Sequence, residues 1–103
     1  MAKYKMKSFF PQFGKNDKFT PLCNAIVFRN AGEVQVRIND NWVLEPGDET
    51  PTISTGFPDV VDETEYTIAF DPTSVNPNRL VNVIYTQIQL KEQKSNFKNC
   101  ENL

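Results

Sequence analysis

The side chains that could carry acid–base or ligand chemistry in this sequence are mostly carboxylates, because its 103 residues include no histidine. The absence of imidazole excludes Ser–His and Cys–His nucleophile pairs and histidine metal ligands. Two distant cysteines, Cys23 and Cys100, do not match a structural zinc site. The four glycines stand alone and form no phosphate-binding loop.

Four carboxylates gather where a loop leads into a strand-like segment, and they are Asp59, Asp62, Glu63 and Glu65. Clustered oxygens are the ligands that calcium prefers, and a pair of carboxylates is the machinery of glycosidases. Their spacing matches no known calcium loop, however, and no recognisable scaffold positions a catalytic pair. We therefore expect a solvated acidic loop, no metal or cofactor, and no enzymatic activity.

Cysteine content and the N-terminal residues bear on the compartment. A secreted chain of this size would more often carry several cysteines. Residues 1–8 are basic, but only Phe9 and Phe10 follow, which is not the apolar stretch of a signal peptide. No segment reaches transmembrane length. We expect a soluble protein made in a reducing cytoplasm with two free thiols, and a Cys23–Cys100 disulfide is the alternative.

Charge is unevenly distributed between the N-terminus and the rest of the chain. The formal net charge is -2, yet residues 1–20 carry five lysines against one aspartate, a net charge of +4. Residues 21–103 carry six basic and twelve acidic residues, a net charge of -6. A basic segment on an acidic body either docks on an acidic partner or folds back on its own domain. The acidic body would repel phosphate, so we expect a protein partner and not nucleic acid.

Residues 1–20 have the pattern of an extended arm. Alternation with Tyr4 and Met6 places Lys3, Lys5 and Lys7 on one side of an extended backbone. Four phenylalanines follow, too many to leave in water, and twenty extended residues span up to about 70 Å. We expect residues 3–13 to cross onto a neighbouring subunit by strand addition. The predicted interface residues are Lys3, Tyr4, Lys5, Lys7, Phe9, Phe10 and Phe13.

An alternating segment, residues 34–44, establishes the fold class. Val36 and Ile38 share one face of a strand, and a three-residue loop at 39–41 sets them opposite Leu44 and Trp42. This arrangement places Asn41 in the left-handed region and makes Trp42 a core or half-core anchor. The Pro-Gly pair at 46–47 fits the centre of a type II turn.

Further segments with strand character fill the chain from residue 24 to residue 90. Residues 24–30 and the first half of 80–90 are apolar on both faces, which predicts central strands buried on both sides. Residues 50–55 predict an edge strand, and residues 63–70 a strand with Tyr66, Ile68 and Phe70 on one face. About six or seven short strands predict an all-β, single-domain antiparallel β-sandwich, immunoglobulin-like or jelly-roll-like. The domain spans 21–90, between the extended N-terminal arm (1–20) and a polar C-terminal tail (91–103).

Residues 24–48 (NAIVFRNAGEVQVRINDNWVLEPGD), with DETEYTIAFD and RLVNVIY further on, resemble small virion proteins of tailed phages that infect Bacteroidetes, including crAss-like phages. The resemblance covers residues 24–86 and is one of pattern. It implies a small β-sandwich with a structural role in the virion: an auxiliary capsid protein that decorates the head, assembled in the host cytoplasm. Its partners would be capsid or other virion proteins, with self-association possible.

Two other functions fit the same sequence. A tail- or fibre-associated sandwich that binds carbohydrate would need exposed aromatic side chains, for which Trp42, Tyr66 and Tyr85 are the candidates outside the arm. A small inhibitor that uses its acidic face, as a mimic of nucleic acid, would bind a basic enzyme in a salt-dependent manner.

Overall fold

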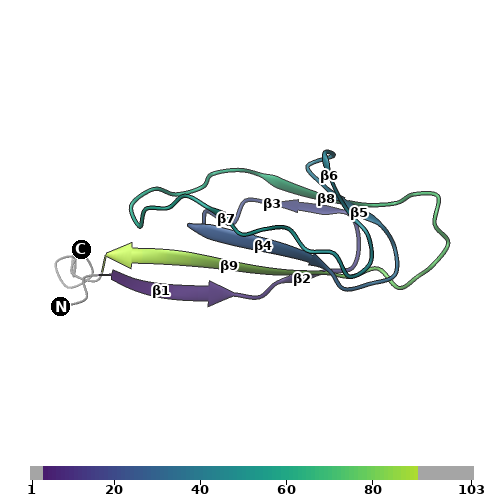
Figure 1. Ribbon diagram of the computed structural model, residues 1–103, viewed down its shortest axis with the longest axis horizontal. Coiled ribbons are helices and arrows are strands. Elements are labelled where there is room, and N and C mark those ends of the chain that lie inside the picture. Colours follow the sequence, from purple (N-terminus) through teal and green to yellow (C-terminus); the bar gives the residue numbers. More distant parts are fainter. Residues whose placement is uncertain (1–3, 91–103) are drawn as a thin grey trace.

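Two antiparallel sheets face each other in the computed structural model, which describes residues 4–90 (Figure 1). The first sheet has the order β1-β9-β4-β7, with β2 also paired to β9. Its strands are β1 (Tyr4–Phe9), β2 (Gln12–Phe13), β4 (Ala25–Asn30), β7 (Ile53–Ser54) and β9 (Val81–Leu90). The second sheet has the order β3-β8-β5-β6, with β3 (Asp17–Phe19), β5 (Val36–Ile38), β6 (Trp42–Leu44) and β8 (Tyr66–Phe70). The predicted all-β sandwich is confirmed.

The core lies between the sheets and is built from alternate residues of the long strands. Strand β4 buries Ile26, Phe28 and Asn30, whereas β8 buries Tyr66, Ile68 and Phe70. Further core residues are Cys23, Val34, Val36, Ile38, Leu44, Val81 and Val83. Period-two alternation therefore places one face of each sheet inward, as expected for a strand with one buried face.

The β5–β6 hairpin has the predicted register. Val36 pairs with Leu44 and Ile38 with Trp42, so the loop holds three residues. Positive φ values occur at Asn39 (53°) and Asp40 (63°) and not at Asn41, so the prediction for Asn41 was wrong. Neighbouring β8 explains the difference, because the Asn39 N–H donates to the Thr67 carbonyl (3.0 Å) and the Thr67 N–H donates to Asn39 Oδ1 (2.7 Å).

Trp42 is not a core anchor, since 39% of its surface is exposed. It lies on β6, the last strand of the second sheet, which has a neighbour on one side only. The Pro46-Gly47 turn forms as predicted: Gly47 has φ of 91°, and the Asp48 N–H donates to the Glu45 carbonyl (2.9 Å). The edge strand expected in residues 50–55 is β7.

Strands β4 and β9 are central in the first sheet, but the prediction that both of their faces are buried was wrong. Val27 is only partly buried, Arg29 is exposed, and Ile84 has 47% of its surface exposed. Among the described residues no third layer covers the outward face of this sheet, so apolar side chains there remain in contact with water. The sandwich is also elongated, with extents of 53 × 23 × 18 Å.

The N-terminal segment folds back on its own domain, so the prediction that residues 3–13 cross onto a neighbouring subunit is wrong for the described residues 4–13. Tyr4–Phe9 pairs with Val81–Leu90 of the same chain, from Tyr4 opposite Leu90 to Phe9 opposite Tyr85, and Gln12–Phe13 continues along β9. The segment then crosses to the second sheet as β3 (Figure 1). Lys3 and the predicted tail, residues 91–103, lie outside the described residues.

Candidate interaction surface on the N-terminal strand

Four of the predicted interface residues, Tyr4, Lys5, Lys7 and Phe9, lie on β1, which forms an edge of the first sheet. β1 is the last strand of the first sheet, and β9 lies on its inner side. Within residues 4–90 no strand pairs with its other side. An edge strand presents a row of backbone donors and acceptors that an extended segment of another chain can pair with.

The two faces of β1 differ in chemistry. Tyr4 and Met6 point outward and are exposed, and Phe10 just beyond the strand is 68% exposed. On the inward face, Lys7 and Phe9 lie beside each other, with Lys7 Nζ 5.8 Å from the centroid of the Phe9 ring. This distance fits a cation–π contact. Lys5 shares the inward face by alternation.

The three phenylalanines of the predicted interface have different environments. Phe9 stacks on Tyr85 of β9, and Phe13 packs against the core with its ring 4.9 Å from that of Phe19. Phe13 is therefore held within the chain, which contradicts its predicted role as an anchor on another molecule. Phe10 is left exposed. Along β1, Tyr4 therefore lies on the outward face, with the exposed Phe10 just beyond the strand, whereas Lys5 and Lys7 share the inward face.

The acidic stretch is partly structural. The Tyr66 hydroxyl donates to Asp62 Oδ2 (2.5 Å), and the Thr64 N–H donates to Asp62 Oδ1 (3.0 Å). Burial raises the pKa of Asp62, but the hydrogen bonds from Thr64 and Tyr66 outweigh it and the pKa is lowered on balance. Burial, followed by the hydrogen bond to Asp62 and then the charge of Asp62, raises the pKa of Tyr66. Asp62 thus ties its loop to β8, and the neighbouring Glu63 is exposed.

No group of three or more His, Cys, Asp or Glu residues able to hold a metal ion occurs within residues 4–90. The same part of the chain has no helix long and apolar enough to cross a membrane.

Cys23 is a buried free thiol, held between the Asp62 loop and β4. Burial, and then the charge of Asp62, raises its pKa to about 11. A thiol with a raised pKa is a weak nucleophile, so Cys23 acts as a small core residue. Its predicted possible partner, Cys100, lies outside the described residues.

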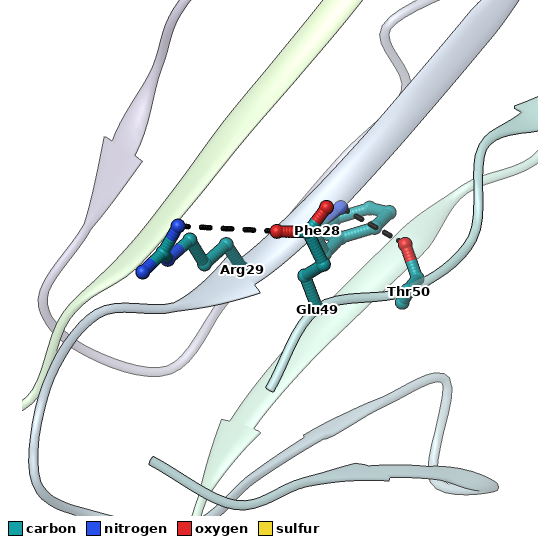
Figure 2. A network of polar contacts seen from close by, with 4 residues as sticks. All are labelled: Phe28, Arg29, Glu49 and Thr50. Atoms are coloured by element: carbon teal, nitrogen blue, oxygen red, sulfur yellow. Dashed lines mark hydrogen bonds and ion pairs between the residues drawn. The ribbon is translucent and has the colours of Figure 1, made fainter. Parts of the chain in front are cut away.

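The arginines of the described residues are spread over the molecule. Arg29 forms an exposed ion pair with Glu49 at 3.9 Å, next to the point where the Thr50 side chain meets the Phe28 backbone (Figure 2). Arg79 donates to the Ser74 carbonyl (2.9 Å). These contacts hold loops against strands and form no joint basic patch.

Of the aromatic residues considered for carbohydrate binding, only Trp42 is exposed. Tyr66 is buried and Tyr85 is half-buried against Phe9.

The sequence did not predict the free edge or the apolar outward face. Apolar residues on both faces of the first half of residues 80–90 predict two buried faces, whereas the face that carries Ile84 is exposed. The alternating lysines of the segment Tyr4-Lys5-Met6-Lys7 were the available signal, since such lysines are typical of an edge strand.

Comparisons with protein-family models, with curated proteins and with solved structures found no match to this chain.

Proposed function

We propose that this chain is a non-enzymatic structural protein of a phage virion, an auxiliary capsid protein that decorates the head and attaches through its N-terminal strand. The observation that carries the proposal is the free edge of β1, bordered by Tyr4, Lys7 and Phe10. The pattern resemblance of residues 24–86 supports the virion setting.

The free edge accounts for how attachment would work. An extended segment of the partner adds to β1, so main-chain hydrogen bonds supply affinity. Lys5 and Lys7 lie on the inward face of β1, and they favour a partner segment with acidic side chains at facing positions. Attachment should therefore weaken as salt is added, because dissolved ions screen the attraction between exposed charges. The screening length is about 10 Å at 0.1 M salt and shortens as the salt concentration rises.

Co-sedimentation with purified particles that lack the protein tests the proposal. The variant Lys5→Glu/Lys7→Glu should bind at least about tenfold more weakly, because like charges oppose the partner segment. The matched control is Lys15→Glu/Lys18→Glu, which makes the same change at exposed positions away from β1. Equal binding of both variants, or no binding of the unmodified protein, would contradict the proposal.

A carbohydrate-binding module on the virion tail or fibre is the second candidate, because Trp42 is exposed on an edge strand. Sugar rings stack on exposed tryptophan faces, and a glycan array would detect such binding. Loss of the signal in Trp42→Ala, with unchanged thermal unfolding, would favour this function over head attachment.

A further inference from the structure

The loop that follows β7 presents apolar side chains to water. Phe57 is 65% exposed, Val60 46% and Val61 47%. We call residues 57–61, which include all three side chains, the apolar loop. Single exposed apolar side chains are ordinary on a protein surface, whereas a cluster of them is typical of a surface that another molecule covers.

A buried amide holds the apolar loop in this shape. Asn24 is 5% exposed, and its Nδ2 donates to the carbonyl oxygens of Val60 (2.9 Å), Pro58 (3.2 Å) and Phe57 (3.3 Å). The Val60 N–H also donates to the Phe57 carbonyl (3.3 Å), so residues 57–60 form a turn around the amide. Because the carbonyl groups converge on Asn24, the outer side of the turn is left to the side chains, in agreement with their exposure.

Leu22 lies beside the apolar loop and has a strained backbone. The next residue, Cys23, pairs with Asp62, the residue that follows the loop, and the Asp62 N–H donates to the Cys23 carbonyl (2.7 Å). Leu22 has φ of 53°, in the left-handed region that leucine disfavours, and its surface is 50% exposed. Gln87 holds it there, because Nε2 donates to the carbonyl oxygens of Pro21 (3.0 Å) and Leu22 (3.2 Å). The strain keeps a leucine half in water, which folding alone does not favour.

The charged residues in and after the apolar loop are all acidic. Asp59 lies within it, Glu63 and Glu65 follow it, and all three are exposed. No lysine or arginine occurs from residue 38 to residue 78. A surface that covers the loop therefore needs apolar groups at its centre and lysine or arginine at its rim. Anionic lipid headgroups do not meet this requirement, so the acidic residues favour a protein over a membrane.

The apolar loop lies at the end of the sandwich where β1 begins (Figure 1). Gln87 connects the two regions, since it is the Cα partner of Lys7 in the β1–β9 ladder and also binds the Leu22 carbonyl. A protein whose segment pairs with β1 therefore brings the rest of its surface close to the loop.

We propose that the apolar loop and Leu22 insert into an apolar groove, rimmed by lysine or arginine, on the same protein that pairs with β1. This inference rests on the proposed attachment through β1 and adds to it a second contact, from a part of the chain that is distant in sequence. The bonds from Asn24 and Gln87 fix both loop segments before the partner arrives, so little conformational freedom is lost on binding.

Co-sedimentation of the full chain with purified particles that lack it, at about 0.1 M and about 1 M salt, separates the two contacts. Val60→Ser/Val61→Ser should bind at least about tenfold more weakly at both salt concentrations, because ions do not screen contacts between apolar groups. Lys5→Glu/Lys7→Glu should lose less binding at the higher salt concentration, because its effect is electrostatic.

The matched control is Val43→Ser/Val75→Ser, which makes the same change at exposed positions on β6 and in the loop before β9. It should bind like the unmodified protein. Unchanged thermal unfolding of each valine variant shows that folding is retained.

Leu22→Asn gives a readout that a merely structural role would not produce. Asparagine tolerates the left-handed region better than leucine, so the free energy of unfolding should be retained or raised. Attachment to the particles should nevertheless weaken, because the exposed apolar side chain is lost.

The failure of this inference and the failure of the proposed function give different results. Loop variants that bind like the control, while Lys5→Glu/Lys7→Glu binds weakly, would overturn the inference and leave attachment through β1 in place. An unmodified protein that does not bind would contradict the proposed function and the inference together. Co-sedimentation of the unmodified protein with phosphatidylcholine vesicles, abolished in Val60→Ser/Val61→Ser, would assign the apolar loop to a membrane and overturn the inference.

Discussion

Phe9 stacks on Tyr85, with ring centroids 4.9 Å apart and ring planes inclined by 18°. The two residues are also Cα partners in the β1–β9 ladder, so the stack secures the N-terminal strand on its inward face. The next residue, Phe10, is exposed. Of these two adjacent phenylalanines, Phe9 therefore stabilises the fold, whereas Phe10 contributes to the surface.

Phe9→Ala should destabilise the protein by about 1–3 kcal/mol, because it removes a half-buried ring and the stacking contact of that ring with Tyr85. Phe10→Ala should change the free energy of unfolding by no more than about 0.5 kcal/mol, since the ring it removes is largely in water. Urea unfolding followed by circular dichroism measures both. Equal losses would mean that the two rings do not divide their roles as the structure indicates.

Asn30→Ala should cost about 2–4 kcal/mol, because Asn30 is fully buried and its side chain satisfies three backbone groups. Its Nδ2 donates to the Val34 carbonyl (2.8 Å) and the Leu44 carbonyl (2.9 Å), and its Oδ1 accepts from the Gly32 N–H (3.1 Å). Chemical denaturation gives the difference. Asn76→Ala, in a loop with an exposed side-chain bond to Glu33, is the control and should cost well under half as much.

Asn39→Ala should lower stability by about 1–2 kcal/mol, because alanine disfavours the positive φ of this position and lacks the bond to Thr67. Asn41→Ala, at the other end of the same loop, should be close to neutral. Thermal unfolding of the pair is a direct check of the loop conformation. A larger loss at position 41 would restore the conformation predicted from the sequence.

The sequence predicted the β5–β6 hairpin well because its information is local. The alternation of Val36, Arg37 and Ile38 allowed only one loop length that keeps the apolar side chains on one face. The positive φ values at Asn39 and Asp40 could not be predicted in this way. They depend on Thr67, which is distant in sequence and comes alongside only when β8 pairs with β5.

A local sequence pattern also could not predict which faces of a strand are covered by a second layer. β9 has apolar residues on both faces, and the sequence does not reveal whether another layer covers each face. The second sheet covers the inward face, whereas Ile84 lies on the outward face, which no layer of the described residues covers. Alternating lysines indicated an extended N-terminal segment but not the strand it joins. The pairing of Tyr4–Phe9 with β9 of the same chain depends on Phe9, Phe13 and Phe19 finding partners in the core region.

Stability should fall as the pH rises above about 9, because the pKa of Cys23 is raised from 9.0 to about 11 in the folded protein. Between these values the unfolded chain releases the thiol proton and the folded chain retains it, so unfolding is favoured. The effect is absent below pH 9 and complete above pH 11. The raised pKa of Tyr66 adds a second loss that begins near pH 10.

Cys23→Ala should therefore flatten the decline in unfolding free energy between pH 9 and 10, measured by urea titration at each pH, even if the variant is less stable throughout. Tyr66→Phe should leave this part of the curve in place and reduce the decline above pH 10. A curve for Cys23→Ala that runs parallel to that of the unmodified protein would contradict the assignment to Cys23.

The central claim is that β1 offers its free edge to another virion protein. Imaging of native particles by electron microscopy at side-chain resolution tests it most directly. The claim predicts the sandwich on the outer surface of the head, with an extended segment of a neighbouring protein paired to β1 and acidic side chains opposite Lys5 and Lys7. Particles that lack the chain, or that hold it with the β1 edge facing solvent, would contradict it.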